Sequence, residues 1–144
     1  MALNGAKRKI YRGDVSENHP QQHEALTDVS GILPGNLLAV NGDGEFVNHG
    51  TQGYVYVANA PPCMDPLTYV YEAGETGFGY IPRSRDVYLM RAVAGLTFAK
   101  DAPLYSNGAG KITTTVGSNT LVGYAHFAQT SATALNDLID VRIK

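Results

Sequence analysis

Two Asn-Gly turns constrain the fold of this sequence more than any other feature. They consist of Asn41, Gly42 and Gly44 in one segment, and of Asn107, Gly108 and Gly110 in another. Asn and Gly tolerate positive φ, and the pair between short apolar segments is typical of a tight β-hairpin. The two hairpin segments align without a gap at an offset of 66 residues. The sequence therefore predicts two related β units, at residues 31–60 and 97–126.

The rest of the chain also divides into short segments that favour strands. β-Branched and aromatic residues recur between turn residues at intervals of about 8 to 12 residues, a spacing typical of all-β domains. The expected strands cover residues 37–40, 45–48, 54–57, 86–94, 96–99, 104–106, 111–114, 121–128 and 138–143. Residues 59–82 are rich in Pro and Gly, and Pro61-Pro62 cannot occupy a central strand. We therefore expect this stretch to be mostly loop.

Only residues 18–30 favour a helix. Asn18 is a suitable N-cap, Pro20 lies in the first turn, and the following residues are acceptable helix formers. The predicted fold class is all-β: a small barrel or sandwich of short antiparallel strands, with an extended N-terminal arm and at most one short helix. The chain would divide into the arm with this helix or loop, residues 1–30, and one β domain, residues 31–144.

Charge is scarce in this sequence and unevenly distributed. Charged residues are 17% of the 144 residues, against about 25% in a typical soluble domain, which indicates that a partner covers part of the surface. Residues 1–12 hold four basic and no acidic side chains, whereas the other 132 residues hold 7 basic and 13 acidic ones, a net charge of −6. We interpret the first twelve residues as a basic docking arm on an acidic body; the alternative is a solvated tail. The candidate contact residues are Lys7, Arg8, Lys9, Ile10, Tyr11 and Arg12.

The sequence also bears on compartment and partners. No apolar stretch near Met1 resembles a signal peptide, and the longest apolar runs are far below the ~18 residues of a membrane helix. We therefore expect a protein made in the cytosol that has no membrane partner. A net charge of −2 and a single aromatic residue in the arm argue against direct binding of nucleic acid.

The residue types that usually carry chemistry form no convincing catalytic or metal-binding pattern. His19 and His23 would share one face of a helix, but no third ligand lies nearby. Cys63 has no neighbouring His, and the second hairpin lacks the helix and the Lys-Ser/Thr signature of a phosphate loop. The Arg-Gly-Asp tripeptide at residues 12–14 is explained as a turn. The sequence predicts no catalytic, cofactor-binding or metal-binding residue, and therefore no enzyme.

Turn glycines and alternating apolar residues form a longer pattern over residues 31–144. The pattern runs through Gly31–Val40, Glu45–Gly53, Gly74–Glu75, Asp86–Tyr88, Lys100–Leu104, Asn107–Ile112, Val122–Ala125 and Val141–Ile143. In these segments the chain resembles the head decoration, or cement, proteins of tailed bacteriophages. The resemblance implies a non-enzymatic virion protein that binds the outer surface of an icosahedral capsid and stabilises contacts between major capsid subunits. Its implied partners are the major capsid protein and further copies of itself, as a dimer or trimer, and we interpret the basic arm as the candidate capsid contact.

Two other functional classes remain open from the residues alone. A carbohydrate- or surface-binding β module would use an exposed tyrosine platform, for which the candidates are Tyr54, Tyr56, Tyr69, Tyr71 and Tyr80. A small metal-assisted hydrolase would need His19 and His23 as ligands. A glycan array would test the first alternative, and a metal titration the second.

Overall fold

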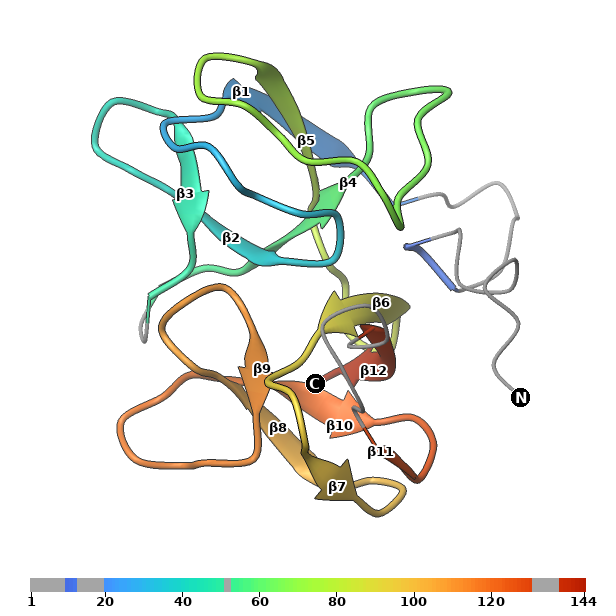
Figure 1. The fold of residues 1–144 in the computed structure, drawn as a ribbon. Helices are drawn as coiled ribbons and strands as arrows, with labels where there is room; N and C mark the ends of the chain where they lie inside the picture. Colours follow the sequence, from blue (N-terminus) through green and yellow to red (C-terminus); the bar gives the residue numbers. More distant parts are fainter. Residues whose placement is uncertain (1–9, 13–19, 51–52, 131–137) are drawn as a thin grey trace.

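The computed structural model describes residues 10–12, 20–50, 53–130 and 138–144, and these residues form strands, turns and loops without any helix (Figure 1). Five antiparallel strands make the first sheet, in the spatial order β1 (Gln22–Leu26), β5 (Thr76–Tyr80), β4 (Tyr56–Asn59), β2 (Leu37–Val40) and β3 (Phe46–Asn48). Five more make the second, in the order β6 (Val87–Arg91), β12 (Leu138–Ile143), β10 (Leu121–Ala125), β8 (Pro103–Ser106) and β9 (Ile112–Thr113). A small pair, β7 (Thr97–Phe98) and β11 (Gln129–Thr130), flanks the second sheet.

This arrangement confirms the predicted all-β class and decides between the two architectures. The two sheets lie one above the other in Figure 1, as in a sandwich, and neither is a closed barrel. One isolated parallel bridge, between Thr27 and Phe46, nevertheless draws the two edges of the first sheet together. A bridge between Ala92 and Ile112 does the same in the second sheet.

The two sheets are built on one plan. In chain order, β1 to β5 of the first sheet correspond to β6, β8, β9, β10 and β12 of the second, and corresponding strands have corresponding neighbours. The edge-joining bridges correspond as well, and an isolated bridge between Ile32 and Tyr71 takes the place of the β7–β11 pair. We call residues 20–82 the first unit and residues 83–144 the second unit. This equivalence is wider than the ranges that the hairpin alignment predicted, because it includes β1, β5, β6 and β12.

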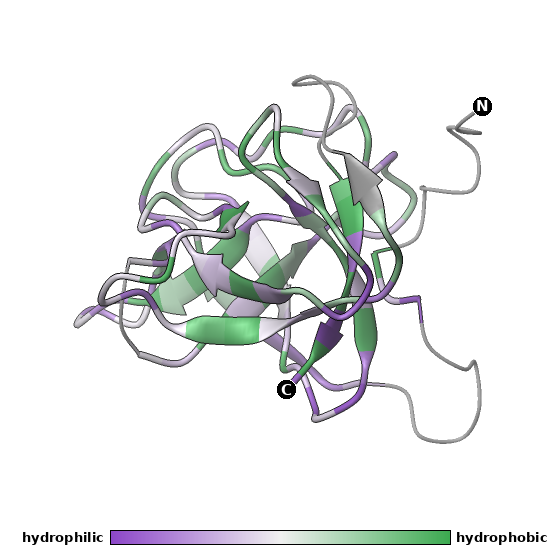
Figure 2. Ribbon diagram, turned by 90° about the horizontal axis from the view of Figure 1, so that it is seen from below, coloured by the Kyte–Doolittle hydropathy of each residue, from purple (hydrophilic) through white to green (hydrophobic). Residues whose placement is uncertain are grey.

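The buried apolar residues form two clusters. The larger contains most of the buried side chains of the second unit, together with Leu37 and Val57 from the first. The smaller belongs to the first unit and consists of Ile32, Leu38, Phe46, Ala58 and Tyr71. Successive strand residues face opposite sides of a sheet, so Leu37 and Leu38 of β2 enter different clusters. Figure 2 shows that hydrophobic and hydrophilic segments alternate along the strands and the loops that join them.

The predicted helix at residues 18–30 is wrong where the structure describes it. Residues 22–26 form β1, which pairs with β5 along its whole length. Alternate side chains are half-buried, and the His23 ring contacts the rings of Phe46 and Tyr56 at centroid distances of 5.6 and 5.7 Å. Tertiary pairing therefore overrides a weak local helix preference. Asn18 and His19 lie outside the described residues.

The expectation that residues 59–82 are mostly loop is confirmed, but the stretch also contains the strand β5. Two of its five residues, Gly77 and Gly79, lie against the Phe46 ring: a Cβ atom added at Gly79 would be 2.8 Å from Phe46 Cζ. The glycines are thus sites where the strand must leave room for an aromatic side chain. Other predicted strands are displaced only at their ends, since 54–57 is replaced by Tyr56–Asn59 and 86–94 by Val87–Arg91.

The two Asn-Gly turns have the same hydrogen bonds. Asn41 Oδ1 accepts from the backbone N–H groups of Asp43 and Glu45, both at 2.9 Å. The side chain of Asn107 accepts in the same way from Ala109 and Lys111, at 2.8 and 3.0 Å. Gly44 and Gly110 each lie three residues after the Asn of their turn, and they have φ values of +80° and +78°. Asn supplies the local cap and Gly the positive φ, so both hairpins close as predicted.

Candidate interaction surfaces

The tip of the second hairpin is docked into the first unit. Gly110 O accepts hydrogen bonds from Leu37 N at 2.8 Å and from Asn36 Nδ2 at 3.1 Å, and Gly110 N donates to His49 O at 3.2 Å. The approach is close, because a Cβ atom at Gly110 would lie 2.6 Å from Asn48 Oδ1. Nearby, the buried His49 ring contacts Ser106 Oγ at 2.8 Å through Nδ1. The docked tip therefore joins the two units through backbone polar groups.

The first hairpin makes no such contact among the described residues. Nothing lies within 4 Å of a Cβ atom built at Gly42 or Gly44, and the tip is exposed. The donor that would bind such a tip is also missing in the second unit, because Pro103 occupies the place of Leu37 and has no backbone N–H. The contact between the units is therefore one-directional: the second unit provides the tip, and the first provides the backbone and side-chain groups that bind it.

Arg91 is a second link between the units. It lies on β6 and is only 3% exposed. Its guanidinium donates to carbonyl oxygens of two loops of the first unit, from Nε to Pro34 O at 2.9 Å and from Nη2 to Pro66 O at 3.4 Å. In addition, Arg91 N donates to Gly35 O at 2.8 Å. A charged group that donates to several carbonyls stabilises the contact more than neutral bonds would.

The start of the described chain is anchored on the second unit. Arg12 N donates to Val87 O and Leu89 N donates to Ile10 O, both at 2.7 Å, so residues 10–12 extend the second sheet beyond β6. Ile10 and Tyr11 are 1% and 4% exposed, and Arg12 Nε lies 3.3 Å from Asp140 Oδ1. Three of the six candidate arm residues therefore belong to the folded body. The other three, Lys7, Arg8 and Lys9, lie outside the described residues.

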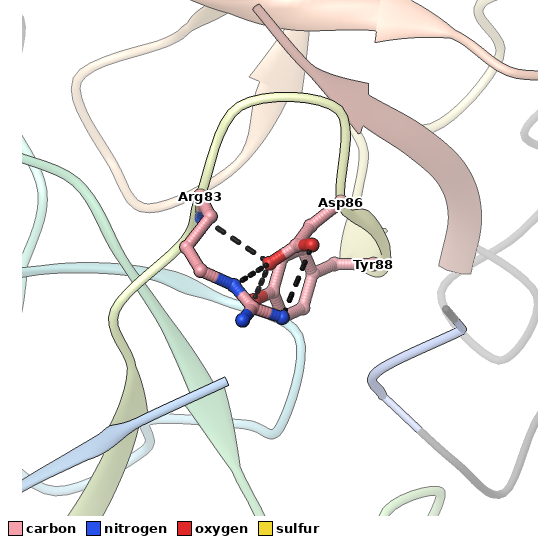
Figure 3. A network of polar contacts seen from close by, with 3 residues as sticks. All are labelled: Arg83, Asp86 and Tyr88. Atoms are coloured by element: carbon pink, nitrogen blue, oxygen red, sulfur yellow. Dashed lines mark hydrogen bonds and ion pairs between the residues drawn. The ribbon is translucent and has the colours of Figure 1, made fainter. Parts of the chain in front are cut away.

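Aromatic and polar side chains reinforce this anchor. The rings of Tyr11, Tyr80 and Tyr88 contact one another at centroid distances between 5.4 and 6.2 Å. Tyr88 OH donates to Asp86 Oδ2 at 3.0 Å, and Arg83 Nε donates to the same oxygen at 3.1 Å (Figure 3). Burial, with a smaller contribution from the Asp86 carboxylate, raises the pKa of Tyr88 well above its usual value. The loop that joins the units is thus held to the chain start.

Charge separates between the two units. Residues 13–82 contain nine acidic residues and no Lys or Arg, whereas residues 83–144 contain seven basic and four acidic ones. Arg12 adds to the side that is already positive, because it follows Ile10 and Tyr11, which pack on the second unit, and lies beside Asp140. The sequence interpretation placed the basic arm on an acidic body and missed this division between the units. The sequence signal for this division was the run of 70 residues, 13–82, that contains no Lys or Arg.

One open cavity and several exposed apolar side chains lie outside the core. The cavity, of about 500 Å³, lies where the first unit meets β10 and the C-terminal residues; it is lined by Tyr54 and Val55 of the first unit and by Leu121, Val122 and Ile143 of the second. Tyr54 is 90% exposed. Other large apolar side chains that remain exposed are Leu26, Val29, Met64, Val70, Ile81, Val116 and Phe127. Exposed apolar side chains therefore occur on both units.

The residues with chemical potential do not assemble into a reactive centre in the described part of the chain. No group of three or more His, Cys, Asp or Glu residues there is arranged to hold a metal ion. His23 lies on a strand, and Cys63 is exposed in a turn. The five tyrosines of the proposed platform differ in exposure and do not form one exposed surface. Tyr71 is fully buried, and Tyr56, Tyr69 and Tyr80 are half-buried. Among the described residues no helix is long and apolar enough to span a bilayer.

Comparison with known proteins identifies one family. A family model described as phage cement protein matches residues 70–143, just over half of the chain. The match begins before β5 and covers the whole strand set of the second unit. No curated protein matches the sequence.

Proposed function

The chain belongs to the phage cement protein family, and on that premise we propose that it binds the outer surface of an icosahedral phage capsid and stabilises contacts between major capsid subunits. The family match carries this proposal. The major capsid protein is its proposed partner, further copies of the chain are a second one, and the outer capsid surface is its proposed location. We propose a purely adhesive role, without catalysis, for a protein made in the host cytoplasm.

The surface of the protein supports an adhesive role. Charged residues are few, and large apolar side chains are exposed on both units. A cement protein works through many modest contacts, because symmetry repeats each one and attachment at one site raises the effective concentration at the next. The opposite charges of the two units would also orient the protein on a charged surface.

Comparison of particles with and without the protein tests the cementing role directly. Phage heads that lack the protein are expected to release their DNA at a lower temperature than decorated heads, and adding the purified protein back is expected to restore the higher temperature. Equal release temperatures would contradict cementing. Binding itself is measured by sedimentation of undecorated heads with the protein, so that a protein that binds without stabilising is recognised.

The basic residues Lys7, Arg8 and Lys9 are the part of the arm that we propose for contact on the particle. The structure sharpens the truncation that tests them, because Ile10 and Tyr11 are core residues and must be kept. A chain lacking residues 2–9 is expected to dissociate from heads at lower salt than the intact chain, and a chain lacking only residues 2–6 is the matched control. Identical salt dependence in all three chains would remove the arm from the contact.

A further inference from the structure

The two units differ at one sheet edge, and the difference leaves a place for an additional strand. On the outer edge of β6, Leu89 N and Val87 O bond to Ile10 O and Arg12 N, and Arg91 N bonds to Gly35 O. Residues 10–12 thus cover this edge as a short antiparallel strand, with Tyr11 opposite Tyr88. The strand that corresponds to β6 in the first unit is β1.

The outer edge of β1 has no such cover among the described residues. Gln21 O and Thr27 N bond to Ile81 and Glu75 beside β5, so the odd-numbered residues of β1 face β5 and the even-numbered ones face outward. The outward N–H and C=O groups belong to Gln22, Glu24 and Leu26, and none of them bonds to another described residue. These are the positions that correspond to Val87, Leu89 and Arg91 of β6. An exposed edge of this kind is a ready template for another extended chain.

The charge around β1 selects which chain fits. Glu24 lies on β1 itself, and Asp28 and Glu75 lie at its end, where Thr27 N bonds to Glu75 O. No Lys or Arg occurs in residues 13–82 to neutralise them. A strand with positive side chains is therefore favoured at this edge, and an acidic strand is disfavoured.

We propose that the outer edge of β1 binds the N-terminal segment, residues 1–9, of a second copy of this chain as an antiparallel strand. Lys7, Arg8 and Lys9 supply the positive charge that the edge lacks. Nine extended residues reach up to about 30 Å beyond the Ile10 anchor, a span that suits contact with a neighbouring copy. The proposal rests on the proposed function only for its setting, in which the capsid holds copies side by side.

The pairing would make a directional link between copies. Each copy carries one donor segment, joined to its second unit, and one acceptor edge, on its first unit. A contact between two different surfaces is heterologous, so repeated links close into a ring when copies surround a symmetry axis. On a capsid the arms would then connect the copies to one another as well as to the shell.

A backbone test separates strand pairing from side-chain contact. Gln22→Pro removes one outward N–H at the first residue of an edge strand, where Pro is tolerated, and Gln22→Ala is the matched control that keeps the N–H. We expect Gln22→Pro to weaken association between copies about tenfold at low salt, and Gln22→Ala to leave it within about twofold. Analytical ultracentrifugation measures the association, and thermal melting verifies that each variant is folded. Equal association constants for the two variants would overturn the proposal.

A charge exchange identifies the occupant of the edge. Glu24→Lys alone, or Lys7→Glu with Arg8→Glu and Lys9→Glu, is expected to weaken association about tenfold, whereas one chain that carries all four changes is expected to recover most of it. Hydrogen exchange provides an independent readout: the outward amides of Glu24 and Leu26 should gain protection as the protein concentration rises, while that of Leu89 is protected throughout. Protection that does not depend on concentration would place the arm on its own chain and overturn the proposal.

Binding to heads distinguishes this proposal from the proposed function. If Gln22→Pro and Glu24→Lys reduce binding to undecorated heads without changing association between copies, the edge accepts a capsid segment and the second-copy proposal is overturned. If the intact chain associates through β1 but ignores the heads, the arm pairing stands and the proposed function fails.

Discussion

The two units have the same strand plan but fill it with different side chains. At one place in the first unit, Phe46 lies across Gly77 and Gly79. At the same place in the second unit, Ile112 corresponds to Phe46, and Ile139 and Val141 correspond to the two glycines. One large ring over two missing side chains fills the space that three branched aliphatic side chains fill in the other unit. The comparison indicates that strand pairing and turns determine the order of the strands. Each core then needs only side chains whose volumes together fill its interior.

The units differ most in how they contact each other, and Arg91 gives the largest expected effect. Arg91→Met leaves buried carbonyl groups of Pro34 and Pro66 without their charged donor, so we expect a loss of about 4 kcal/mol in the free energy of unfolding. The corresponding residue of the first unit is Leu26, which is 49% exposed, and Leu26→Met should change stability by less than about 0.5 kcal/mol. Urea denaturation measures both, and comparable losses would contradict a link that depends on Arg91.

The two hairpin tips provide a matched pair of glycines. Gly44→Ala and Gly110→Ala both introduce a side chain at positive φ, which costs about 1 kcal/mol. Only Gly110→Ala also forces a Cβ atom against Asn48 and Leu37, so we expect about 3 kcal/mol for this variant and about 1 kcal/mol for Gly44→Ala. Equal costs in thermal or urea unfolding would show that the docked tip does not contribute to the contact between the units.

The close packing of the Phe46 ring on Gly79 predicts that substitutions at these two positions are energetically coupled. Gly79→Ala places a Cβ atom 2.8 Å from Phe46 Cζ and should destabilise the protein by about 2 kcal/mol. Phe46→Ile removes that atom, so Gly79→Ala should cost at least about 1 kcal/mol less in the Phe46→Ile background than in the natural one. A double-mutant cycle from urea denaturation measures this difference, and additive losses would contradict the packing argument.

Alkaline pH should affect both units together. Burial raises the pKa of Tyr71 in the first unit, of Tyr88 in the second, and of Tyr80 at their junction. Because these pKa values are higher in the folded than in the unfolded chain, the stability is complete below about pH 10 and is lost as the pH rises further. We expect the melting temperature to fall by roughly 5 °C per pH unit above about pH 10, in one transition. A melting temperature that stays constant up to about pH 11, or two separate transitions, would contradict this expectation.

Local signals predicted local features, and features that depend on distant residues were missed. The Asn41 and Asn107 turns were predictable, because their hydrogen bonds lie within five residues. β5 was not, since two glycines in five residues argue against a strand unless the Phe46 ring is known to lie over them. β1 was mistaken for a helix because its pairing partners lie 50 or more residues away in the sequence. The family was identified from the turn pattern, whereas the burial of Ile10 and Tyr11 and the uncovered β1 edge depend on tertiary pairing alone.

Pro103 prevents a second contact of the kind that the Gly110 tip makes with Leu37. If its position carried a backbone N–H, as Leu37 does, the second unit would offer the same donor to the free hairpin tip of another molecule, and such unions could propagate into a fibre. Because Pro103 lacks this donor, the contact occurs only between the two units of one polypeptide and does not extend to further molecules.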